Sequence, residues 1–231
     1  MQNPRCKRRN EERGAFRRNV LLIAIVLAFP QAAWGIDAEE VVENLQKRFA
    51  ETRSLSARFE RRHYWKLVDQ EQKIKGRLHV QKPDKFRFET HVQTVVTDGK
   101  TAWNYSPGNN QVVLSGYETV QDDRSYEKLL FDLILLGGYL ERFDTRYGGE
   151  TRIQRKRCHI VELTSRDEER YITQVRLWID RKSWVVLQVE YRNINEDVTT
   201  YVLSDTKANK DLDASLFRFN PPNGVEIVDL R

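Results

Sequence analysis

Residues 73–89 read Lys-Ile-Lys-Gly-Arg-Leu-His-Val-Gln-Lys-Pro-Asp-Lys-Phe-Arg-Phe-Glu and indicate the fold class. Ahead of Lys82-Pro83-Asp84, apolar residues or glycine occupy every second position, and after it phenylalanine does the same. Strict alternation of apolar and polar residues is typical of a β-strand with one face in water and the other in the core. The Pro-Asp pair favours a turn. The stretch therefore predicts two consecutive strands joined by a turn.

The same two-residue period recurs along most of the chain. It is found in residues 55–60, 103–105, 112–114, 161–163, 175–179 and 185–191. Asp98-Gly99 is a strong signal for a β-hairpin turn, and residues 106–110 predict another turn. Because strands do not alternate with crossover helices, the pattern predicts about eleven strands in one antiparallel sheet. An open sheet of that size tends to curl.

Two segments carry helical signals instead. Residues 37–52 begin with Asp37 as an N-cap, followed by Glu40, and have apolar residues at helical spacing. Residues 125–136 lie between Ser125, a candidate N-cap, and a pair of glycines. Seven of the eight residues from 129 to 136 are apolar, so this helix must be buried on more than one side. It is either a core helix or a lid over an apolar cavity.

The formal charge of +5 comes from the first 35 residues. Seven of the 39 basic and two of the 34 acidic side chains lie there, which leaves 32 of each sign in residues 36–231. A basic head, an apolar run over residues 20–29 and small residues one and three positions before Ile36 predict a secretory signal peptide cleaved at that point. We therefore expect a signal peptide over residues 1–35 and one domain over residues 36–231.

A membrane anchor is the alternative for this segment. Ten apolar residues in a helix rise only ~15 Å, about half the hydrocarbon core of a bilayer, which favours the cleaved peptide. Arg17-Arg18 is compatible with twin-arginine export and with ordinary secretion. Since Cys158 is the one cysteine after residue 35, the exported chain has no internal disulfide and no cysteine cluster for a metal.

Catalytic motifs are absent from the sequence. The histidines are scattered and lack metal-ligand spacing: His63, His79, His91 and His159. No nucleophile elbow, phosphate-binding loop or dinucleotide fingerprint occurs. Arg61-Arg62-His63-Tyr64-Trp65 combines basic and aromatic residues, but an exported neutral chain gives no reason to expect nucleic acid. The sequence thus predicts no catalytic residue, no metal site and no cofactor.

Four segments, in order, match a known set of motifs. Residues 54–59 read Ser-Leu-Ser-Ala-Arg-Phe, and residues 76–88 combine Gly-Arg-Leu with Lys-Pro-Asp-Lys-Phe-Arg-Phe. Residues 97–107 read Thr-Asp-Gly-Lys-Thr-Ala-Trp-Asn-Tyr-Ser-Pro, and residues 217–225 read Phe-Arg-Phe-Asn-Pro-Pro-Asn-Gly-Val. Together they resemble the periplasmic outer-membrane lipoprotein carrier (LolA) family.

The resemblance implies a mostly β (α+β) fold, in which a curved antiparallel sheet forms an unclosed barrel covered by helices that act as a lid. It also implies a monomeric periplasmic carrier in a Gram-negative-type envelope. The implied partners are acylated lipoproteins, an inner-membrane ABC lipoprotein exporter and, if present, an outer-membrane acceptor lipoprotein. Each acyl CH₂ removed from water is worth ~0.8 kcal/mol, so such cargo needs a dry groove.

The resemblance favours a groove lined by residues at alternating strand positions, and packing in an ordinary core is the alternative for its aromatic residues. The groove is expected to be lined by Phe86, Phe88, Trp103 and Tyr105, and covered by Leu129, Leu133, Ile134 and Leu136. Lys82 stands where the family has an arginine that latches the lid, and Phe88 stands where it has a tryptophan. Because lysine lacks the rigid fork of arginine, we expect a weaker or differently placed latch.

Two other functions remain open. A lipid- or lipoprotein-sensing regulatory protein of the envelope could use the same fold and the same cavity. An envelope hydrolase acting on lipid would need a nucleophile and a base at that cavity.

Overall fold

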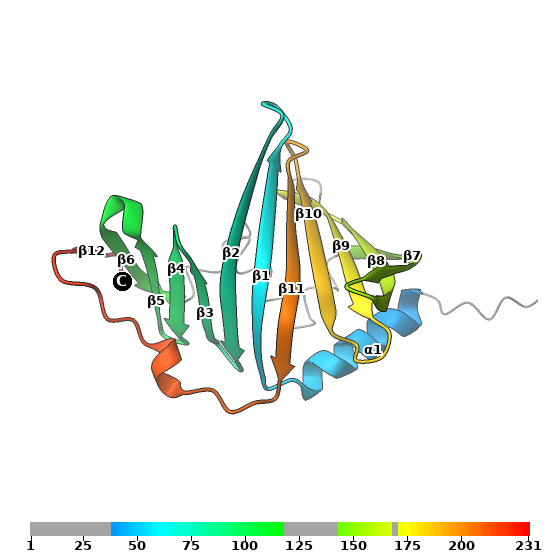
Figure 1. Cartoon of the computed structure of the whole chain (residues 1–231), viewed down its shortest axis with the longest axis horizontal. Helices are drawn as coiled ribbons and strands as arrows, with labels where there is room; N and C mark the ends of the chain where they lie inside the picture. The colour runs from blue at the N-terminus through cyan, green and yellow to red at the C-terminus, as the bar shows by residue number, and fades with distance from the viewer. Residues whose placement is uncertain (1–37, 118–142, 168–170) are drawn as a thin grey trace, which may run out of the picture. The chain divides into compact units, whose positions relative to one another are not determined.

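The computed structural model describes residues 38–117, 143–167 and 171–231. Residues 36–231 form one compact unit. Within the described ranges, a single α-helix, α1 (Ala38–Glu51), precedes twelve strands that belong to one sheet (Figure 1). None of the helices in these ranges is both long enough and apolar enough to cross a membrane.

The bounds of the strands and of the two short 3₁₀ helices are as follows. They are β1 (Ser54–Trp65), β2 (Gln70–Gln81), β3 (Lys85–Thr90), β4 (Thr94–Asp98), β5 (Thr101–Ser106), η1 (Pro107–Asn109), β6 (Gln111–Gly116), β7 (Phe143–Ile153), β8 (Lys156–Ser165), β9 (Ile172–Asp180), β10 (Val186–Asn193), β11 (Val198–Ala208), η4 (Ala214–Phe217) and β12 (Glu226–Asp229).

The sheet is open, with β12 and β7 at its two ends. Its order is β12-β6-β5-β4-β3-β2-β1-β11-β10-β9-β8-β7. All neighbouring strands pair antiparallel except β12, which pairs parallel with β6. This confirms the predicted mostly β class and the unclosed antiparallel sheet, which has twelve strands where about eleven were predicted. Alternation does not mark β12, since only four residues form this edge strand.

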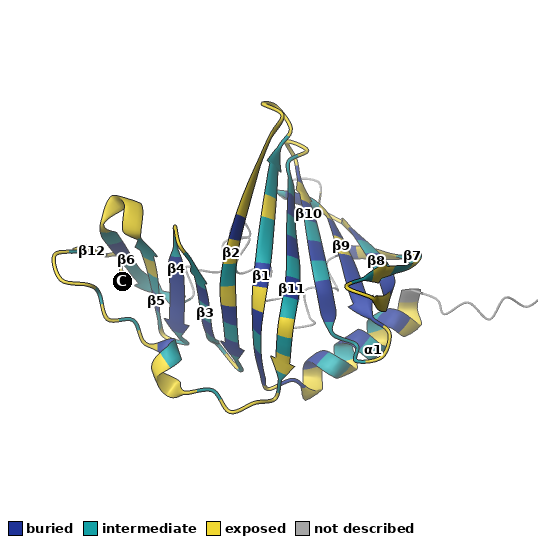
Figure 2. Ribbon diagram, viewed as in Figure 1, coloured by how far each residue is buried: buried dark blue, intermediate teal, exposed yellow. Residues whose placement is uncertain are grey.

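One face of the sheet carries the main apolar core. On β1, β2 and β3 this face holds Leu55, Phe59, Leu78, Val80, Phe86 and Phe88, all buried. We call it the inner face and the opposite one the outer face. In the central strands buried and more exposed residues alternate (Figure 2), as expected when successive side chains point to opposite sides.

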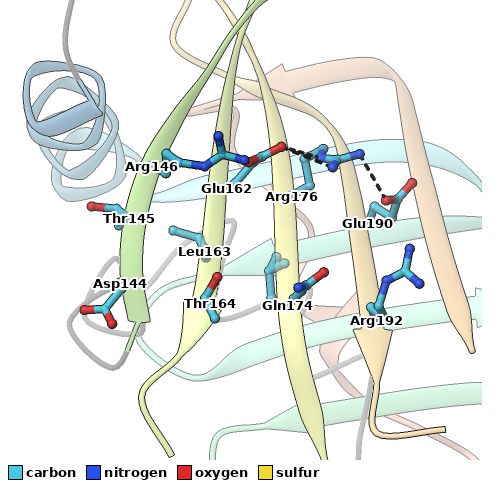
Figure 3. A pocket seen from close by; sticks show the side chains of 11 residues that line it. Asp144, Thr145, Arg146, Glu162, Leu163, Thr164, Gln174, Arg176, Glu190 and Arg192 are labelled. Carbon is cyan, nitrogen blue, oxygen red and sulfur yellow. Dashed lines mark hydrogen bonds and ion pairs between the residues drawn. The ribbon is translucent and has the colours of Figure 1, made fainter. Parts of the chain in front are cut away.

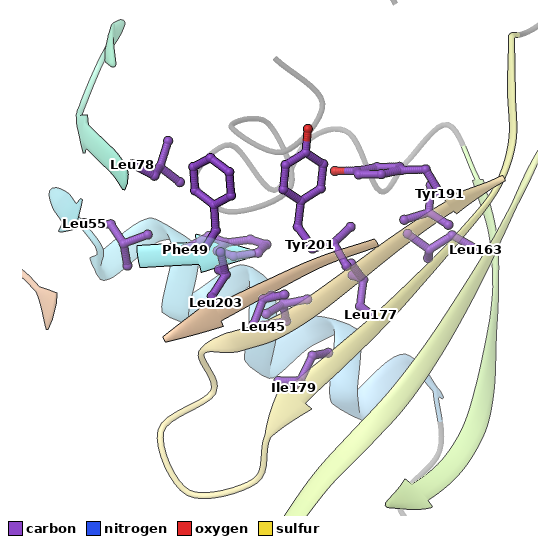
Figure 4. Close-up of a cluster of buried hydrophobic side chains, with 14 of the residues drawn as sticks. Leu45, Phe49, Leu55, Leu78, Leu163, Leu177, Ile179, Tyr191, Tyr201 and Leu203 are labelled. Atoms are coloured by element: carbon purple, nitrogen blue, oxygen red, sulfur yellow. The ribbon is translucent and has the colours of Figure 1, made fainter. Parts of the chain in front are cut away.

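Helix α1 packs against the inner face. Its buried residues Val41, Leu45 and Phe49 are spaced at four positions, so they share one side of the helix, and they join the same core cluster as the strands. Figure 4 shows side chains of the helix and of the strands pointing toward one another. The helix predicted over residues 37–52 is thus present. The helix predicted over residues 125–136, with Leu129, Leu133, Ile134 and Leu136, lies outside the described residues.

The C-terminal segment, by which we mean residues 214–219, packs on the outer face. Phe217 in η4 is buried, and η4 contacts β3 and β4. An Nη atom of Arg87 on β3 donates to the Leu216 carbonyl at 3.5 Å. Further along, the rings of Phe219 and Tyr105 lie 5.4 Å apart. This segment therefore provides a second apolar layer, over one part of the outer face only.

Candidate functional site

Four aromatic rings from four strands meet on the inner face. We call Phe59, Phe88, Tyr191 and Tyr201 the inner aromatic cluster. The Phe59 and Phe88 rings stack at 4.6 Å, and Tyr201 meets them edge-on at 5.7 and 6.4 Å. Tyr191 meets Tyr201 at 6.3 Å. All four residues are buried, and their rings contact one another in series across the centre of the sheet.

Gly76 makes this arrangement possible. It lies on β2 directly opposite Phe59, between the strands that carry Phe59 and Phe88. A Cβ atom at Gly76 would lie 2.3 Å from Cζ of Phe59 and 2.3 Å from the carbonyl oxygen of Glu89. Because glycine has no side chain, the Phe59 ring can lie across β2 and reach Phe88.

Two of the four predicted groove residues lie on the inner face, and two do not. Phe86 and Phe88 belong to the core cluster there. Trp103 pairs with Val96, which pairs with Arg87 of the outer face, so the Trp103 side chain is also on the outer face.

Tyr105 shares the face of Trp103 because it is two residues further along β5, and it contacts Phe219. This corrects the sequence-based grouping of Trp103 and Tyr105 with the two phenylalanines. Both lie on the outer face, where Tyr105 forms part of the layer beneath the C-terminal segment.

Lys82 connects the sheet to helix α1. Its Nζ donates a hydrogen bond to the backbone carbonyl of Phe49, in the last turn of the helix. The same carbonyl also accepts from the backbone N–H of Thr52 at 3.1 Å. Lys82 is thus a second donor at the C-terminal end of the helix, where the helix dipole attracts a cation. Burial lowers the pKa of Lys82. Lys82, at the position of the latch that the resemblance implies, thus contacts α1. The predicted lid helix over residues 125–136 lies outside the described residues.

His159 is a buried polar residue on the inner side of β8. Its side chain is 2% exposed, its Nδ1 lies 3.1 Å from the hydroxyl of Tyr147, and its ring stacks on Trp184 at 5.5 Å. Glu150 lies 3.8 Å away and is bound in turn by Arg181. Burial, followed by the Arg181 charge, lowers the pKa of His159.

A polar groove of about 560 Å³ lies on the outer face of β7–β10. Figure 3 shows a row of alternating charges across it, formed by Arg146, Glu162, Arg176 and Glu190. Arg176 lies 3.1 Å from Glu162 and 3.6 Å from Glu190. Arg146 also pairs with Glu162, so the two arginines together balance the two carboxylates. A groove lined by such exposed ion pairs is unsuited to an acyl chain.

Metal-binding and thiol chemistry have little support in the described ranges. Within them, no three His, Cys, Asp or Glu residues are grouped closely enough to hold a metal ion. Cys158 is fully buried against Trp178 and Leu187, and burial raises the pKa of its thiol. A buried thiol of raised pKa is a poor nucleophile.

Sequence reasoning missed Phe59, Tyr191 and Tyr201 as parts of one site. Each occupies an apolar position of an alternating strand, which marks it as buried. Their meeting depends on the pairing of β1 with β11, which are about 140 residues apart in the chain. The local signal that could have pointed to the cluster is Gly76, a glycine at an apolar position of a strand.

A family model and two named relatives point to one family. The profile of the outer membrane lipoprotein carrier protein LolA family matches residues 50–220. An outer-membrane lipoprotein carrier protein of Proteus mirabilis is 29% identical over 213 residues, which cover 90% of this chain and 96% of that protein. One from Legionella pneumophila is 24% identical over 214 residues, which cover 91% of this chain and 98% of that protein.

Two uncharacterized proteins are also similar. One from Methanocaldococcus jannaschii is 23% identical over 211 residues, or 90% of this chain, but the match spans only 58% of that protein. A solved structure from Thermus thermophilus superposes with a TM-score of 0.54 at 17% identity, covering 83% of this chain and 98% of that one. This second likeness is one of fold.

Proposed function

The chain belongs to the outer membrane lipoprotein carrier protein LolA family, and on that premise we propose that it carries lipoproteins across the periplasm. In this proposal the protein binds the acyl chains of lipoproteins released from the inner membrane and delivers them to the outer membrane. Its partners are acylated lipoproteins, an inner-membrane ABC exporter and, where present, an outer-membrane acceptor lipoprotein. Residues 1–35 direct export and are removed before Ile36.

The apolar inner face supports this proposal most strongly. The inner aromatic cluster and its neighbours Phe86, Leu78 and Val80 give an open sheet one continuous apolar side. Acyl chains need such a surface, because each CH₂ kept from water contributes ~0.8 kcal/mol. Helix α1, held by Lys82, forms one wall, and in this proposal the helix predicted over residues 125–136 forms the cover.

Carrying a lipoprotein requires neither bond-breaking nor a cofactor. The protein needs an apolar surface that opens and closes at modest cost, so that cargo can be received and handed over. We therefore propose a non-enzymatic role. Buried His159 is compatible with this role. Its hydrogen bond with Tyr147 and its stacking on Trp184 account for its burial without a catalytic function.

Release of lipoprotein from spheroplasts tests the proposal. Purified protein is added to spheroplasts that express an acylated lipoprotein or the same polypeptide with its lipidated cysteine replaced. We expect a soluble complex with the acylated form and none with the control form. Failure to release the acylated form would contradict the carrier role. Binding of pre-solubilised lipoprotein without any release would instead favour the sensing role.

A further inference from the structure

The turn between β1 and β2 is unusually apolar for its position. Leu67 is 95% exposed and Val68 is 56% exposed. The tip of the hairpin lies beyond the neighbouring strands in Figure 1, and Figure 2 colours it as exposed. Turns of this kind are normally made of glycine, proline and short polar residues, so two large aliphatic side chains here call for a partner.

A second turn lies at the same end of the sheet. The backbone N–H of Lys66 donates to the carboxylate of Asp197 at 3.0 Å, which ties the β1–β2 turn to the β10–β11 turn. That second turn carries Ile194, which is 56% exposed. Three of the six exposed large apolar residues in the described ranges thus lie on two adjoining turns at this end of the sheet.

The hairpin is also strongly basic. Residues 58–77 contain seven basic and three acidic side chains, whereas residues 36–231 as a whole carry equal numbers of each. The strand register places Arg58 directly opposite Arg77, and Arg62 directly opposite Lys73. Like charges in directly opposite positions repel each other and destabilise a sheet, so an anionic partner would reduce this repulsion.

Acidic neighbours offset part of this charge. Arg58 lies 3.3 Å from Asp205, Arg62 lies 3.1 Å from Glu60, and Lys73 lies 2.7 Å from Glu71. These are exposed pairs and hold their partners weakly. Residues 58–77 by themselves carry an excess of four positive charges. Neighbouring elements bring three carboxylates against them: Asp205 beside Arg58, Glu196 3.9 Å from Lys66, and Asp197 on the backbone N–H of Lys66.

Two aromatic residues, Tyr64 and Trp65, immediately precede the apolar turn in the sequence. Trp65 ends β1, and its ring meets the ring of His63 at 4.4 Å. The hydroxyl of Tyr64 donates to Asp69 at 2.8 Å. Tryptophan and tyrosine favour the boundary between hydrocarbon and headgroups, because one part of the ring is apolar and the other is polar.

We propose that the β1–β2 hairpin docks the protein on an anionic lipid bilayer. Leu67 and Val68 enter the interface, Trp65 and Tyr64 lie at the level of the headgroups, and the basic outer face of the hairpin meets the lipid phosphates. Charge complementarity and the nearly complete exposure of Leu67 favour a bilayer over an acidic protein surface. The docking needs no lipoprotein, so it stands apart from the proposed cargo binding.

Vesicle flotation tests the docking directly. The protein isolated from expressing cells is mixed with phosphatidylcholine vesicles, with and without phosphatidylglycerol. All variants in the assay begin at the same N-terminal residue. We expect binding to the anionic vesicles that weakens with added salt. Leu67→Asp with Val68→Asp should lower the affinity by tenfold or more. Leu230→Asp, at a residue that is 65% exposed and away from the hairpin, is the matched control and should bind normally.

Charge reversal separates the two parts of the proposal. Lys73→Glu with Lys75→Glu should weaken binding to anionic vesicles and leave circular dichroism unchanged. Equal binding by the unsubstituted protein and the Leu67→Asp, Val68→Asp variant would overturn the proposal. So would the absence of any vesicle binding, even if that variant were defective in delivery, because the hairpin would then serve a protein partner. The Leu67→Asp, Val68→Asp variant should still release lipoprotein from spheroplasts normally. Its result therefore tests the docking separately from the carrier role.

Discussion

Phe59 on β1 stacks on Phe88 on β3 with their ring centroids 4.6 Å apart and their planes at 19°, although β2 runs between the two strands. Rings on alternate strands can approach so closely only when the strand between them offers no side chain at that point. Gly76 meets this requirement on β2. The centre of the proposed acyl-binding surface thus depends on one glycine.

Replacing Gly76 with alanine should destabilise the protein. Alanine normally stabilises a strand relative to glycine, but here its methyl group would overlap the Phe59 ring and the Glu89 carbonyl. We expect a loss of about 2 kcal/mol in the free energy of unfolding, as for other overpacked cores. Urea unfolding followed by circular dichroism measures it.

Gly108→Ala is the matched control for this change. A Cβ at Gly108 would meet nothing within 4 Å, so its unfolding free energy should stay within ~0.5 kcal/mol of the original. If Gly76→Ala were as stable as the control, the aromatic stack would not depend on the missing side chain.

Lys82→Met should loosen helix α1. Methionine keeps the length and the apolar stem of lysine but cannot donate to the Phe49 carbonyl. We expect a loss of about 1 kcal/mol in stability and faster hydrogen exchange over residues 45–51, measured by mass spectrometry. Lys82→Arg keeps a donor and should exchange like the original protein. Unchanged exchange in Lys82→Met would show that this contact does not hold the helix.

Much of the fold follows from local patterns. Alternation in residues 73–89 predicts β2 and β3, and the Asp37 cap with apolar residues at helical spacing predicts α1. These signals are local because a strand or a helix needs only the residues along its own length to establish which side is apolar.

The face shared by different strands is harder to predict. The residues of β4 from Thr94 to Thr97 are all buried, because the inner core covers one side and the C-terminal segment covers the other. A strand covered on both sides shows no alternation, so its sequence does not indicate which residues point to which face. Because β4 lies between β3 and β5, the sequence could not tell that Trp103 and Tyr105 point to the opposite face from Phe86 and Phe88.

Acid should weaken the protein partly through His159. Because burial lowers its pKa in the folded state, the unfolded chain takes up the proton at a higher pH than the folded chain does. The free energy of unfolding should therefore decrease as pH falls below about 6.5, the ordinary pKa of histidine, until the folded state is also protonated.

His159→Gln provides the comparison. Glutamine can both donate and accept, so it can keep a hydrogen bond with Tyr147. The variant should therefore fold, and its unfolding free energy should change less between pH 7.5 and 5. Urea titrations across that range measure the slope. His63 and His79 also have lowered pKa values, so part of the slope should remain. An identical slope in the variant would exclude His159 as a source.

The two faces of the sheet should respond differently to loss of an aromatic ring. If acyl chains bind the inner face, Phe88→Leu should weaken binding of a fluorescent fatty acid, because it removes the ring that stacks on Phe59. Trp103→Leu changes an aromatic residue on the outer face, so acyl binding should stay within about twofold of the original. Both proteins are first checked for folding by circular dichroism, and binding is measured by titration of the probe. Weaker binding in Trp103→Leu with normal binding in Phe88→Leu would place the acyl site under the C-terminal segment and contradict the inner-face proposal.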